Sequence, residues 1–423
     1  MTHDSHSSAP VDLPHILKRS QEAAIALGGI RAADRNQALH AVAQVIDDRQ
    51  DDILEANTLD LEASREMAVP DLILDWLKLT PERLQTAVKI LHRLGELSDP
   101  VQQRVMSTSY QLDNCQTYGQ LVPLGVIAMI YEALPELGAI AAGMCIKTGN
   151  SLILRGGSEA SHSNAAIAQA IQLALDDIGL PNGCLQLLDP DHGASIREVV
   201  TQDQFINLII PYGRPSLVQQ VVRQATAPVL QSAMGNCYLY WSPSGSLDLV
   251  RHLILDSHQS EPDPVNAIEK VLIHRNQNSA ALNTLWNNLQ EKGFQLRGDA
   301  ALVAEYPELM LAEANEWRQA YLNKIVAFKS VESLEEAIAW INQHSSGHAD
   351  CLVTESYQES RQFSAGVNSA SVYINSSPRF SRNPRRISAI CLGMSNQKGH
   401  RRGSIGLETL TTVKHVIQGN SWI

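Results

Sequence analysis

The sequence predicts an α/β protein in which helices cover parallel sheets in more than one domain. Short apolar runs rich in branched residues, typical of strands buried on both faces, alternate with segments of helical periodicity. The alternation begins near Val122 and begins again after Ser246, so a second α/β domain is expected. At 423 residues the chain also exceeds the usual size of a single hydrophobic core, which favours two or three domains.

The N-terminal part is expected to be helical. Leu13–Met67 carries Ala, Leu, Ile and Gln at helical spacing with few helix breakers, and is interpreted as a helical layer over a sheet. Thr80-Pro81 is typical of a helix start, with Thr80 as the N-cap and proline in the first turn. Met106–Gln120 alternates apolar and polar residues, which predicts an antiparallel hairpin, interpreted as an arm that reaches another subunit.

The stretch Val122–Asn164 is the most informative because its pattern is that of a βαβ unit. Val126–Tyr131 is the first predicted strand, and Leu137–Ile146 is a small-residue helix that can pack closely against a sheet. Thr148-Gly149-Asn150 stops that helix with residue types that tolerate left-handed backbone, and Ser151–Leu154 begins a second parallel strand.

A glycine pair follows this second strand. Arg155-Gly156-Gly157 leads into the polar helix start Ser158–Ser161, a layout that presents backbone N–H groups and the positive end of a helix dipole to an anion. Glycine serves a tight turn equally well, so a phosphate site and a simple turn both remain open.

The alternation of strands and helices continues toward the C-terminus. The remaining elements predicted in the first domain are helix 164–178, strand 184–188, helix 195–201, strand 205–210, helix 216–225 and strand 228–230. In the second domain they are helix 246–256, strand 268–274, helix 279–292, strand 324–328, helix 333–344, strand 350–353, helix 358–365 and strand 371–374, and the tail 406–423 is expected to end in a strand. In the first domain such alternation points to a doubly wound parallel sheet that binds a nucleotide at the carboxyl ends of its strands, although the GxGxxG fingerprint is absent.

Composition and charge argue against several functions. A net charge of −12 disfavours general nucleic-acid binding. No apolar run reaches the ~18 residues of a membrane span and the N-terminus lacks a signal pattern, so a soluble cytoplasmic protein is expected. The six cysteines form no CxxC pair, which argues against a disulfide framework or a zinc site. Among the 14 histidines, His344 and His348 are four residues apart but flank Ser345-Ser346-Gly347, a poor helix, which favours ordinary loop side chains over a metal pair.

Four blocks of the sequence together resemble one enzyme family. They are VPLGVIAMIYEALPE from Val122, IKTGNSLILRGGSEAS from Ile146, PNGCLQLLD from Pro181 and GLETLTTVKH from Gly406. On these blocks the chain, from about Leu13 to its C-terminus, resembles the γ-glutamyl phosphate reductases, also called glutamate-5-semialdehyde dehydrogenases, of the aldehyde dehydrogenase superfamily.

The resemblance implies an aldehyde dehydrogenase-like α/β fold with a doubly wound parallel-sheet cofactor domain, a second α/β catalytic-type domain and a hairpin oligomerisation arm. The implied boundaries are 1–105 and 122–240 for the NADP-binding-type domain, 106–121 and 406–423 for the arm, 241–376 for the catalytic-type domain, and 377–405 for a basic segment returning to the cofactor domain. Assembly into a homo-oligomer through the arm and tail is implied as well.

The resemblance also implies a reaction. Members of the family reduce L-glutamyl 5-phosphate to the semialdehyde with NADPH, a step of proline synthesis. A cysteine thiolate attacks the acyl phosphate, hydrogen bonds hold the resulting oxyanion, and hydride from the nicotinamide resolves the thioester.

The position that should carry the nucleophile is changed. Where the family has a motif similar to R-P-S-T-C-N, this chain has Glu261-Pro262-Asp263-Pro264-Val265-Asn266. Valine has no lone pair with which to attack, and no neighbouring base can supply one. The sequence therefore predicts that the catalytic residue is missing at Val265, next to Asn266, which excludes the family's covalent route. A nucleophile relocated to another cysteine is the alternative.

The position implied for the oxyanion is changed too. The family pattern Y-E-A-R-P-N is here Tyr131–Glu136, so Glu136 replaces an asparagine that would donate to the oxyanion, and Leu134 replaces an arginine suited to the substrate. A carboxylate only accepts hydrogen bonds and repels developing negative charge. Glu261 likewise replaces an arginine. Each change alone fits neutral drift, but together with Val265 they favour a loss of the chemistry.

The cofactor site implied by the resemblance is kept in one half. Arg155 matches the position that faces the adenosine ribose or its 2′-phosphate, and Gly156, Gly157 and Gly213 are retained, which makes these four the candidate cofactor-binding residues. In the other half, the turn P-R-G-G is Pro211–Arg214, T-G-G-I-G is Gln231–Gly235, and F-G-L-G-A-E is Arg386–Cys391 without its glutamate. NADP binding is therefore an open expectation.

The segment from Arg379 to Arg402 carries seven cations and no acidic residue. It is interpreted either as surface charge that balances an acidic protein or as a site for an acidic protein or a phosphate-bearing ligand. The residues of that candidate site are Arg379, Arg382, Arg385, Arg386, Arg401 and Arg402.

The sequence as a whole favours a γ-glutamyl-phosphate-reductase-like protein that has lost reductase activity and acts by binding a partner or ligand. The alternative is an active NADPH-dependent reductase that uses an unrecognised nucleophile or transfers hydride directly to the acyl phosphate.

Overall fold

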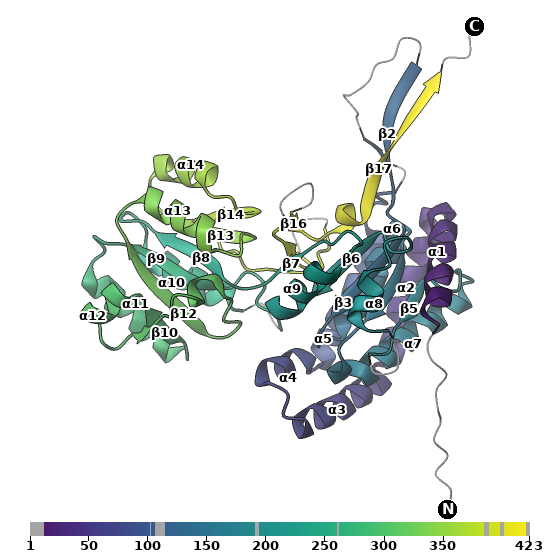
Figure 1. Cartoon of the computed structure of the whole chain (residues 1–423), viewed down its shortest axis with the longest axis horizontal. Helices are drawn as coiled ribbons and strands as arrows, with labels where there is room; N and C mark the ends of the chain where they lie inside the picture. The colour runs from purple at the N-terminus through teal and green to yellow at the C-terminus, as the bar shows by residue number, and fades with distance from the viewer. Residues whose placement is uncertain are drawn as a thin grey trace, which may run out of the picture. The chain divides into compact units, whose positions relative to one another are not determined.

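The computed structural model describes residues 12–101, 103–105, 115–190, 194–259, 262–384, 389–397 and 402–419 (Figure 1). The chain divides into two compact units, which are described separately. Unit 1 comprises Met1–Gln231, Asn383–Leu392 and Ile405–Ile423, and unit 2 comprises Ser232–Arg382 and Gly393–Ser404. Within the described residues no helix is both long and apolar enough to cross a membrane.

Unit 1 is built on a parallel sheet with the strand order β5-β4-β3-β6. Its strands are β3 (Val126–Tyr131), β4 (Ser151–Arg155), β5 (Leu185–Leu187) and β6 (Leu208–Tyr212). Every residue of β3 is buried, as expected for a central strand covered on both faces. The chain runs from β3 outward to β5 and then returns to the other side of β3 as β6, so the strand order reverses between β3 and β6.

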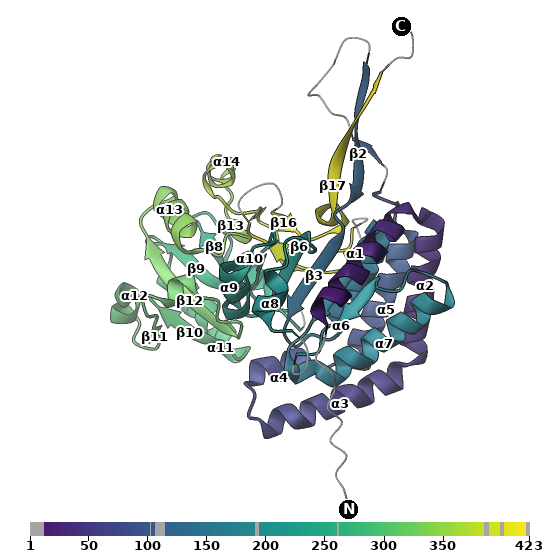
Figure 2. The same ribbon diagram turned by 45° about the vertical axis from the view of Figure 1, so that its right-hand side comes forward.

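Helices cover both faces of this sheet (Figure 2). They are α1 (Leu13–Gly29), α2 (Ala32–Asp48), α3 (Gln50–Glu66), α4 (Asp71–Leu77), α5 (Pro81–Glu96), α6 (Glu136–Thr148), α7 (Ser161–Asp177), α8 (Ile196–Val200) and α9 (Pro215–Gln224), with the short 3₁₀ helices η1 (Ser158–Ala160) and η3 (Leu407–Leu410). Helices α1, α8 and α9 pack on the face of Val126, Ala128 and Ile130, while α6 packs on the opposite face against Ile127 and Met129. The predicted N-cap of α5 is confirmed, since the Thr80 hydroxyl accepts a hydrogen bond from Arg83 N at 3.3 Å.

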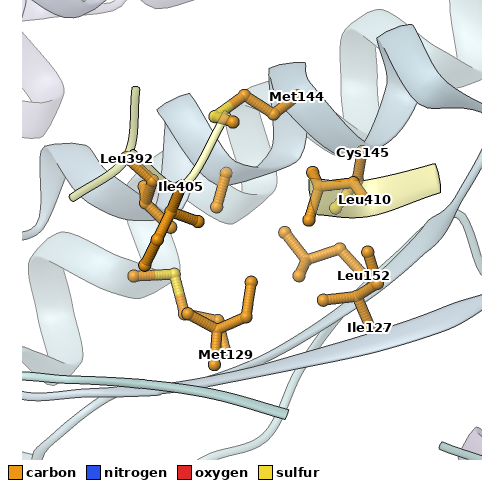
Figure 3. Close-up of a pocket in the computed structure, with 10 residues that line it drawn as sticks. Ile127, Met129, Met144, Cys145, Leu152, Leu392, Ile405 and Leu410 are labelled. Atoms are coloured by element: carbon orange, nitrogen blue, oxygen red, sulfur yellow. The ribbon is translucent and has the colours of Figure 1, made fainter. Parts of the chain in front are cut away.

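The residues after the second unit return to cover the α6 face of the unit 1 sheet. Leu392, Ile405 and Leu410 close a small apolar space over Ile127 and Met129 (Figure 3). The cavity has a volume of about 10 Å³, the room of one water molecule, and is lined by apolar side chains and the Cys145 thiol. It is therefore a packing imperfection of the core and not a ligand site.

The predicted stop after α6 ties three segments together. Gly149 ends the helix with φ +75°, in the left-handed region that glycine tolerates. Asn150, fully buried, accepts a hydrogen bond from Gly125 N and donates one to Leu410 O, each at 2.8 Å. One side chain thus joins the start of β3, the end of α6 and the C-terminal segment.

An antiparallel ribbon extends from unit 1 (Figures 1 and 2). It consists of β1 (Arg104–Val105), β2 (Cys115–Pro123) and β17 (Thr411–Gly419) in the order β1-β2-β17. Of the predicted hairpin Met106–Gln120, residues 106–114 lie outside the described residues, and the rest belongs to β2. The main partner of β2 is the predicted C-terminal strand, with Thr411 opposite Pro123 and Gly419 opposite Cys115.

Unit 2 is built on a parallel sheet with the order β11-β10-β12-β9-β8-β13-β14. Its strands are β8 (Cys237–Trp241), β9 (Ile268–His274), β10 (Gln295–Gly298), β11 (Met310–Leu311), β12 (Ile325–Val331), β13 (Ala349–Val353) and β14 (Ser371–Ile374). Helices α10 (Leu247–Ser257), α11 (Ser279–Glu291) and α12 (Ala300–Glu305) cover one face, and α13 (Leu334–His344) and α14 (Tyr357–Gly366) cover the other. Unit 2 also holds η2 (Glu316–Arg318) and a small antiparallel sheet of β7 (Ser232–Ala233), β15 (Met394–Ser395) and β16 (Gly403–Ser404).

The predicted strand 228–230 is wrong as a strand, because only Val229 forms a bridge, parallel to Ile209. Pro228 has no N–H to continue a ladder, and the segment is held by two hydrogen bonds at Ile209. Strands β8 and β10 were not predicted. The functional labels attached to the sequence-derived domain boundaries remain predictions, and the basic segment 377–405 contributes residues to both units.

We expect Asn150→Ala to lower the free energy of unfolding by about 2–3 kcal/mol, because it leaves the buried Gly125 N–H and Leu410 carbonyl without a partner. Urea unfolding monitored by circular dichroism measures the loss. Asn182→Ala, at an exposed asparagine of the same unit, is the matched control. Equal stability of the two variants would contradict the role given to Asn150.

Candidate active site and cofactor turns

The loop before β9 holds the position predicted to lack a nucleophile. Val265 is fully buried, and its carbonyl accepts hydrogen bonds from Gly235 N at 2.9 Å and from His348 Nε2 at 2.8 Å. The side chain at this position therefore points into packed protein and offers no reactive atom.

Ion pairs and hydrogen bonds fix the rest of this loop within unit 2. The fully buried Asp263 carboxylate accepts from Arg382 Nη1 at 2.9 Å and from Nη2 at 2.5 Å. Asn266 Nδ2 donates to Pro378 O at 2.7 Å, while its Oδ1 is buried without a hydrogen-bond partner in the described part of the chain. Hydrogen bonds thus hold the loop at three positions, Asp263, Val265 and Asn266.

The cysteine nearest to this loop is not activated. Cys237 Sγ lies 3.3 Å from His348 Nε2, but both residues are fully buried. Because Nε2 donates its proton to Val265 O and Nδ1 faces the Ser346 hydroxyl at 2.8 Å, His348 has no free acceptor for the thiol. Burial lowers the pKa of His348 from 6.5 to about 4 and raises the pKa of Cys237 well above its usual value. The pair therefore stays neutral.

Other cysteines share this environment. Burial raises the pKa of Cys145 and Cys351 well above the usual range, and that of Cys184 to about 12. A thiolate is the reactive form of cysteine, so none of these three is set up for attack. Cys391 is buried and Cys115 lies in β2 of the ribbon.

Glu136, at the predicted oxyanion position, begins α6 and is paired within unit 1. Arg83 of α5 donates to it from Nη2 at 2.6 and 2.8 Å and from Nε at 3.1 Å. The Glu136 side chain is only 7% exposed. Both carboxylate oxygens are engaged by a guanidinium, so the group serves as a structural ion pair and not as a hydrogen-bond donor to a ligand.

The backbone just before Glu136 is strained. Ala133 and Leu134 have φ values of +49° and +45°, in a region that residues with a Cβ rarely adopt. Two such residues in succession, at about 1–3 kcal/mol each, are typical of a functional turn. Leu134 is fully buried, so its side chain fills the core of unit 1.

The glycine turn after β4 is filled by the chain itself. A Cβ on Gly157 would lie 2.1 Å from Glu159 Oε2, and one on Gly156 would lie 2.1 Å from Asn164 Nδ2. Glu159 accepts a hydrogen bond from Ala133 N at 2.6 Å, and burial raises the pKa of its carboxyl group. A side chain at either glycine would displace the end of Glu159 or of Asn164. Arg155, partly buried, donates to Gly156 O at 3.3 Å.

The turn after β6 lies at the strand-order reversal of unit 1, where α/β sheets commonly bind ligands. Gly213 has φ +147°, and a Cβ there would lie 2.6 Å from Glu132 Cγ. Glu132 accepts from Arg214 N at 2.5 Å, Nε at 3.0 Å and Nη2 at 2.9 Å. The carboxylates of Glu159 and Glu132 thus lie beside Gly157 and Gly213 in the two glycine turns.

The arginines of the basic segment are only partly described. Arg379 pairs with Asp256 at 3.2 Å and Arg382 with Asp263, while Arg402 Nη1 donates to Asn368 Oδ1 at 3.1 Å. Arg385, Arg386 and Arg401, together with Glu261, lie outside the described residues. Two members of the candidate anion site thus already have internal carboxylate partners, and its role stays a prediction.

Among the described residues no group of three or more His, Cys, Asp or Glu side chains could hold a metal ion. His344 stacks on Trp340 with ring centroids 3.9 Å apart, and His348 is the donor to Val265 O. No local sequence pattern indicates that second contact, since 83 residues separate its partners. The Glu136–Arg83 pair was missed for the same reason, with 53 residues between the partners.

Comparisons with known proteins agree on one relationship. The aldehyde dehydrogenase family model matches residues 3–235. Gamma-glutamyl phosphate reductase 2 of Synechocystis is 54% identical over 414 residues, 98% of each chain, and the gamma-glutamyl phosphate reductase of Gloeobacter violaceus is 38% identical over 96% of each chain.

Solved structures extend this similarity. The crystal structure of gamma-glutamyl phosphate reductase from Thermotoga maritima has a TM-score of 0.89 at 31% identity and covers 98% of this chain and 100% of its own. An acetylating aldehyde dehydrogenase from Geobacillus thermoglucosidasius, with a TM-score of 0.68 and 13% identity, covers 97% of both chains and shares the fold.

The buried His348 predicts an acid sensitivity of folding. Its pKa is about 4 in the folded chain and about 6.5 when unfolded, so below pH 6.5 the unfolded state binds a proton that the folded state does not. Stability is therefore lost as the pH falls from 6.5 toward 4. Between about pH 7.5 and about pH 5, this group should lower the free energy of unfolding by about 2 kcal/mol.

His348→Gln removes the titration while an amide can still donate to Val265 O. We expect the difference in unfolding free energy between the two pH values to shrink by about 2 kcal/mol in this variant. His252→Gln, at an exposed position on α10, should leave the difference unchanged. Identical pH dependence of parent and His348→Gln would refute the assignment.

Proposed function

Because the chain belongs to the γ-glutamyl phosphate reductases of the aldehyde dehydrogenase family, we propose that it has lost the thiol-dependent reduction of this family and works by binding. The observation that carries the proposal is Val265, a fully buried valine at the position of the family's nucleophile. No covalent acyl intermediate can form there, since a saturated hydrocarbon side chain cannot attack the acyl phosphate.

The internal pairing of charged side chains supports the same proposal. Glu136 is neutralised by Arg83, and Glu132 by Arg214, in each case by two or more hydrogen bonds. A group that already has its full set of partners gains little by turning toward a substrate. Glu136, at the position implied for stabilising the oxyanion, thus takes part in a structural ion pair of unit 1.

NADPH, which the family implies, would supply hydride when bound. In this chain Arg155 matches the family position that meets its adenosine portion, while the turns Pro211–Arg214 and Gln231–Gly235 carry side chains where the family has glycine. We therefore propose that the chain does not depend on NADP, and that it acts as a soluble cytoplasmic binding protein.

The second candidate is active NADPH-dependent reduction of L-glutamyl 5-phosphate to L-glutamate 5-semialdehyde in proline biosynthesis. It is favoured by a reductase relative that is 54% identical over 98% of both chains. It requires direct hydride transfer to the acyl phosphate, or a nucleophile other than the residue at 265.

The two candidates differ in one assay. The purified protein is given L-glutamate 5-semialdehyde, NADP⁺ and phosphate, and NADPH formation is followed by absorbance, with the Thermotoga maritima relative as the positive control. We expect turnover at least about 10⁴-fold below the control, the size of effect seen when a catalytic nucleophile is removed. Turnover close to the control that an alanine substitution of one residue abolishes would establish the second candidate.

Restoring the thiol alone should not restore activity. In Val265→Cys the sulfur would lie in a fully buried position, where desolvation keeps it protonated. Glu136 would still occupy the position at which the family has a hydrogen-bond donor. We expect Val265→Cys to react with iodoacetamide at least about tenfold more slowly than free cysteine at the same pH. Val265→Ala serves as the control for background labelling. Rapid labelling, or turnover in Val265→Cys, would contradict this prediction.

We also propose self-association through the ribbon. Val413 and Ile417 of β17 are 39% and 56% exposed. They are four residues apart on one strand, so both side chains lie on the same face of the ribbon, where exposed apolar side chains indicate an interaction surface. Val413→Asp with Ile417→Asp should reduce the molar mass measured by light scattering to that of one chain. Ile25→Asp on α1, at a site 76% exposed, is the control that should leave the mass unchanged.

A further inference from the structure

A pocket opens in unit 2 at the carboxyl ends of four adjacent parallel strands, β12, β9, β8 and β13. His274 is the last residue of β9, Glu332 follows β12, and Ser356 begins the helix after β13. The volume is about 360 Å³, within the range of small-molecule sites.

The position of the pocket follows from the winding of the sheet. The connection from β8 to β9 runs through α10 on one face, and the connection from β12 to β13 runs through α13 on the other. The crossovers therefore diverge beside β8, which leaves a crevice outside the strand ends. Val265 precedes β9, so it lies at the opposite edge of the sheet, about 20 Å from His274 along a seven-residue strand.

The floor of the pocket is a tyrosine with an unused hydroxyl group. Tyr240 of β8 is 1% exposed, and its ring packs with Leu334 and Phe363 under α13 and α14. Its hydroxyl reaches the pocket and makes no hydrogen bond to any residue in the described part of the chain. Because the ring is buried while the residue lines the pocket, its hydroxyl oxygen can accept a hydrogen bond from a ligand there.

The carboxylates of Glu335 and Glu359 line the same pocket as this hydroxyl. Burial raises the pKa of the Tyr240 hydroxyl well above the usual range, and the charges of Glu359, at the start of α14, and Glu335, at the start of α13, raise it further. Glu335 is exposed and makes no hydrogen bond or ion pair within the described residues. Glu359 accepts a hydrogen bond from the Thr354 hydroxyl.

The helix ends do not make this an anion site. Ser333 Oγ caps α13 by accepting from Glu336 N at 3.2 Å, and Ser356 Oγ caps α14 by accepting from Glu359 N at 3.3 Å. Glu332 also lines the pocket and is paired outside it with Arg275. No lysine or arginine lines the pocket in the described part of the chain, so its potential is negative.

We propose that this pocket binds the ammonium group of a small primary amine. Such a group has three donors, which match the carboxylates of Glu335 and Glu359 and the hydroxyl oxygen of Tyr240. A metal ion suits the site less well, since the described residues offer no cluster of three metal-ligating side chains. The proposal is independent of the reductase question because the pocket lies at the other edge of the sheet from Val265.

The test uses the full chain and three probes of the same length, titrated by isothermal calorimetry. Butylammonium has three N–H donors, butyltrimethylammonium has the charge without donors, and 1-butanol has neither the charge nor the ammonium group. We expect butylammonium to bind at least tenfold more tightly than either of the other probes. Equal affinity for the two cations would overturn the proposal, as would no saturable heat with butylammonium at millimolar concentration.

Variants locate the site. Glu335→Gln and Tyr240→Phe should each weaken butylammonium binding at least fivefold, and Glu335→Gln with Glu359→Gln should abolish it. Glu305→Gln with Glu308→Gln, exposed residues in and just after α12 of the same unit, changes the net charge equally and should leave affinity unchanged. If Glu359→Gln impairs folding through Thr354, the single variant Glu335→Gln decides the matter. An equal loss in the control pair would show general charge attraction and refute the site.

Discussion

A parallel sheet covered by helices on both faces leaves only the ends of its strands for polar chemistry, and both units of this chain obey that constraint. The faces of the sheets are apolar cores, as the fully buried strand β3 illustrates. Charged side chains accordingly collect at strand ends, with Glu132, Glu159 and Arg214 in unit 1. In unit 2 one edge carries the loop of Val265 and the other carries the pocket of Tyr240. The fold thus fixes where ligands can bind, and the side chains decide whether they do.

Near the site positions that the sequence predicted, charged side chains of this chain are paired with one another. Arg83 holds Glu136, Arg214 holds Glu132, and Arg382 holds Asp263, each by at least two hydrogen bonds. An active site needs polar groups that are left partly unsatisfied until the substrate arrives, which weakens folding. Satisfying these groups internally removes that weakness. The strained backbone at Ala133 and Leu134 directly precedes one of these paired carboxylates, Glu136.

Local signals in the sequence predicted local structure well. The strand Val126–Tyr131, the stop at Thr148-Gly149-Asn150 and the cap at Thr80 all depend on residues within a few positions, and the structure has them. Long-range partners could not be read from such signals. Arg83 pairs with Glu136 only because α5 packs on α6. His348 donates to the Val265 carbonyl only because the start of β13 and the loop before β9 lie near one another in unit 2. The amine pocket needed the strand order, which periodicity does not give.

The pairing of β2 with β17 has a consequence for synthesis of the chain. Pro123 must wait for Thr411 as its partner, and Asn150 must wait for the carbonyl of Leu410. The 151 contiguous residues Ser232–Arg382, the bulk of unit 2, are made in between. At roughly 5–20 residues per second, these residues alone take roughly eight to thirty seconds to make, and until then the ribbon lacks β17 and the α6 face of the unit 1 sheet lacks its C-terminal cover. During that interval β2 presents an unpaired edge to the ribosome's surroundings, so nascent chains, more than finished ones, are the form most exposed to aggregation and to chaperones.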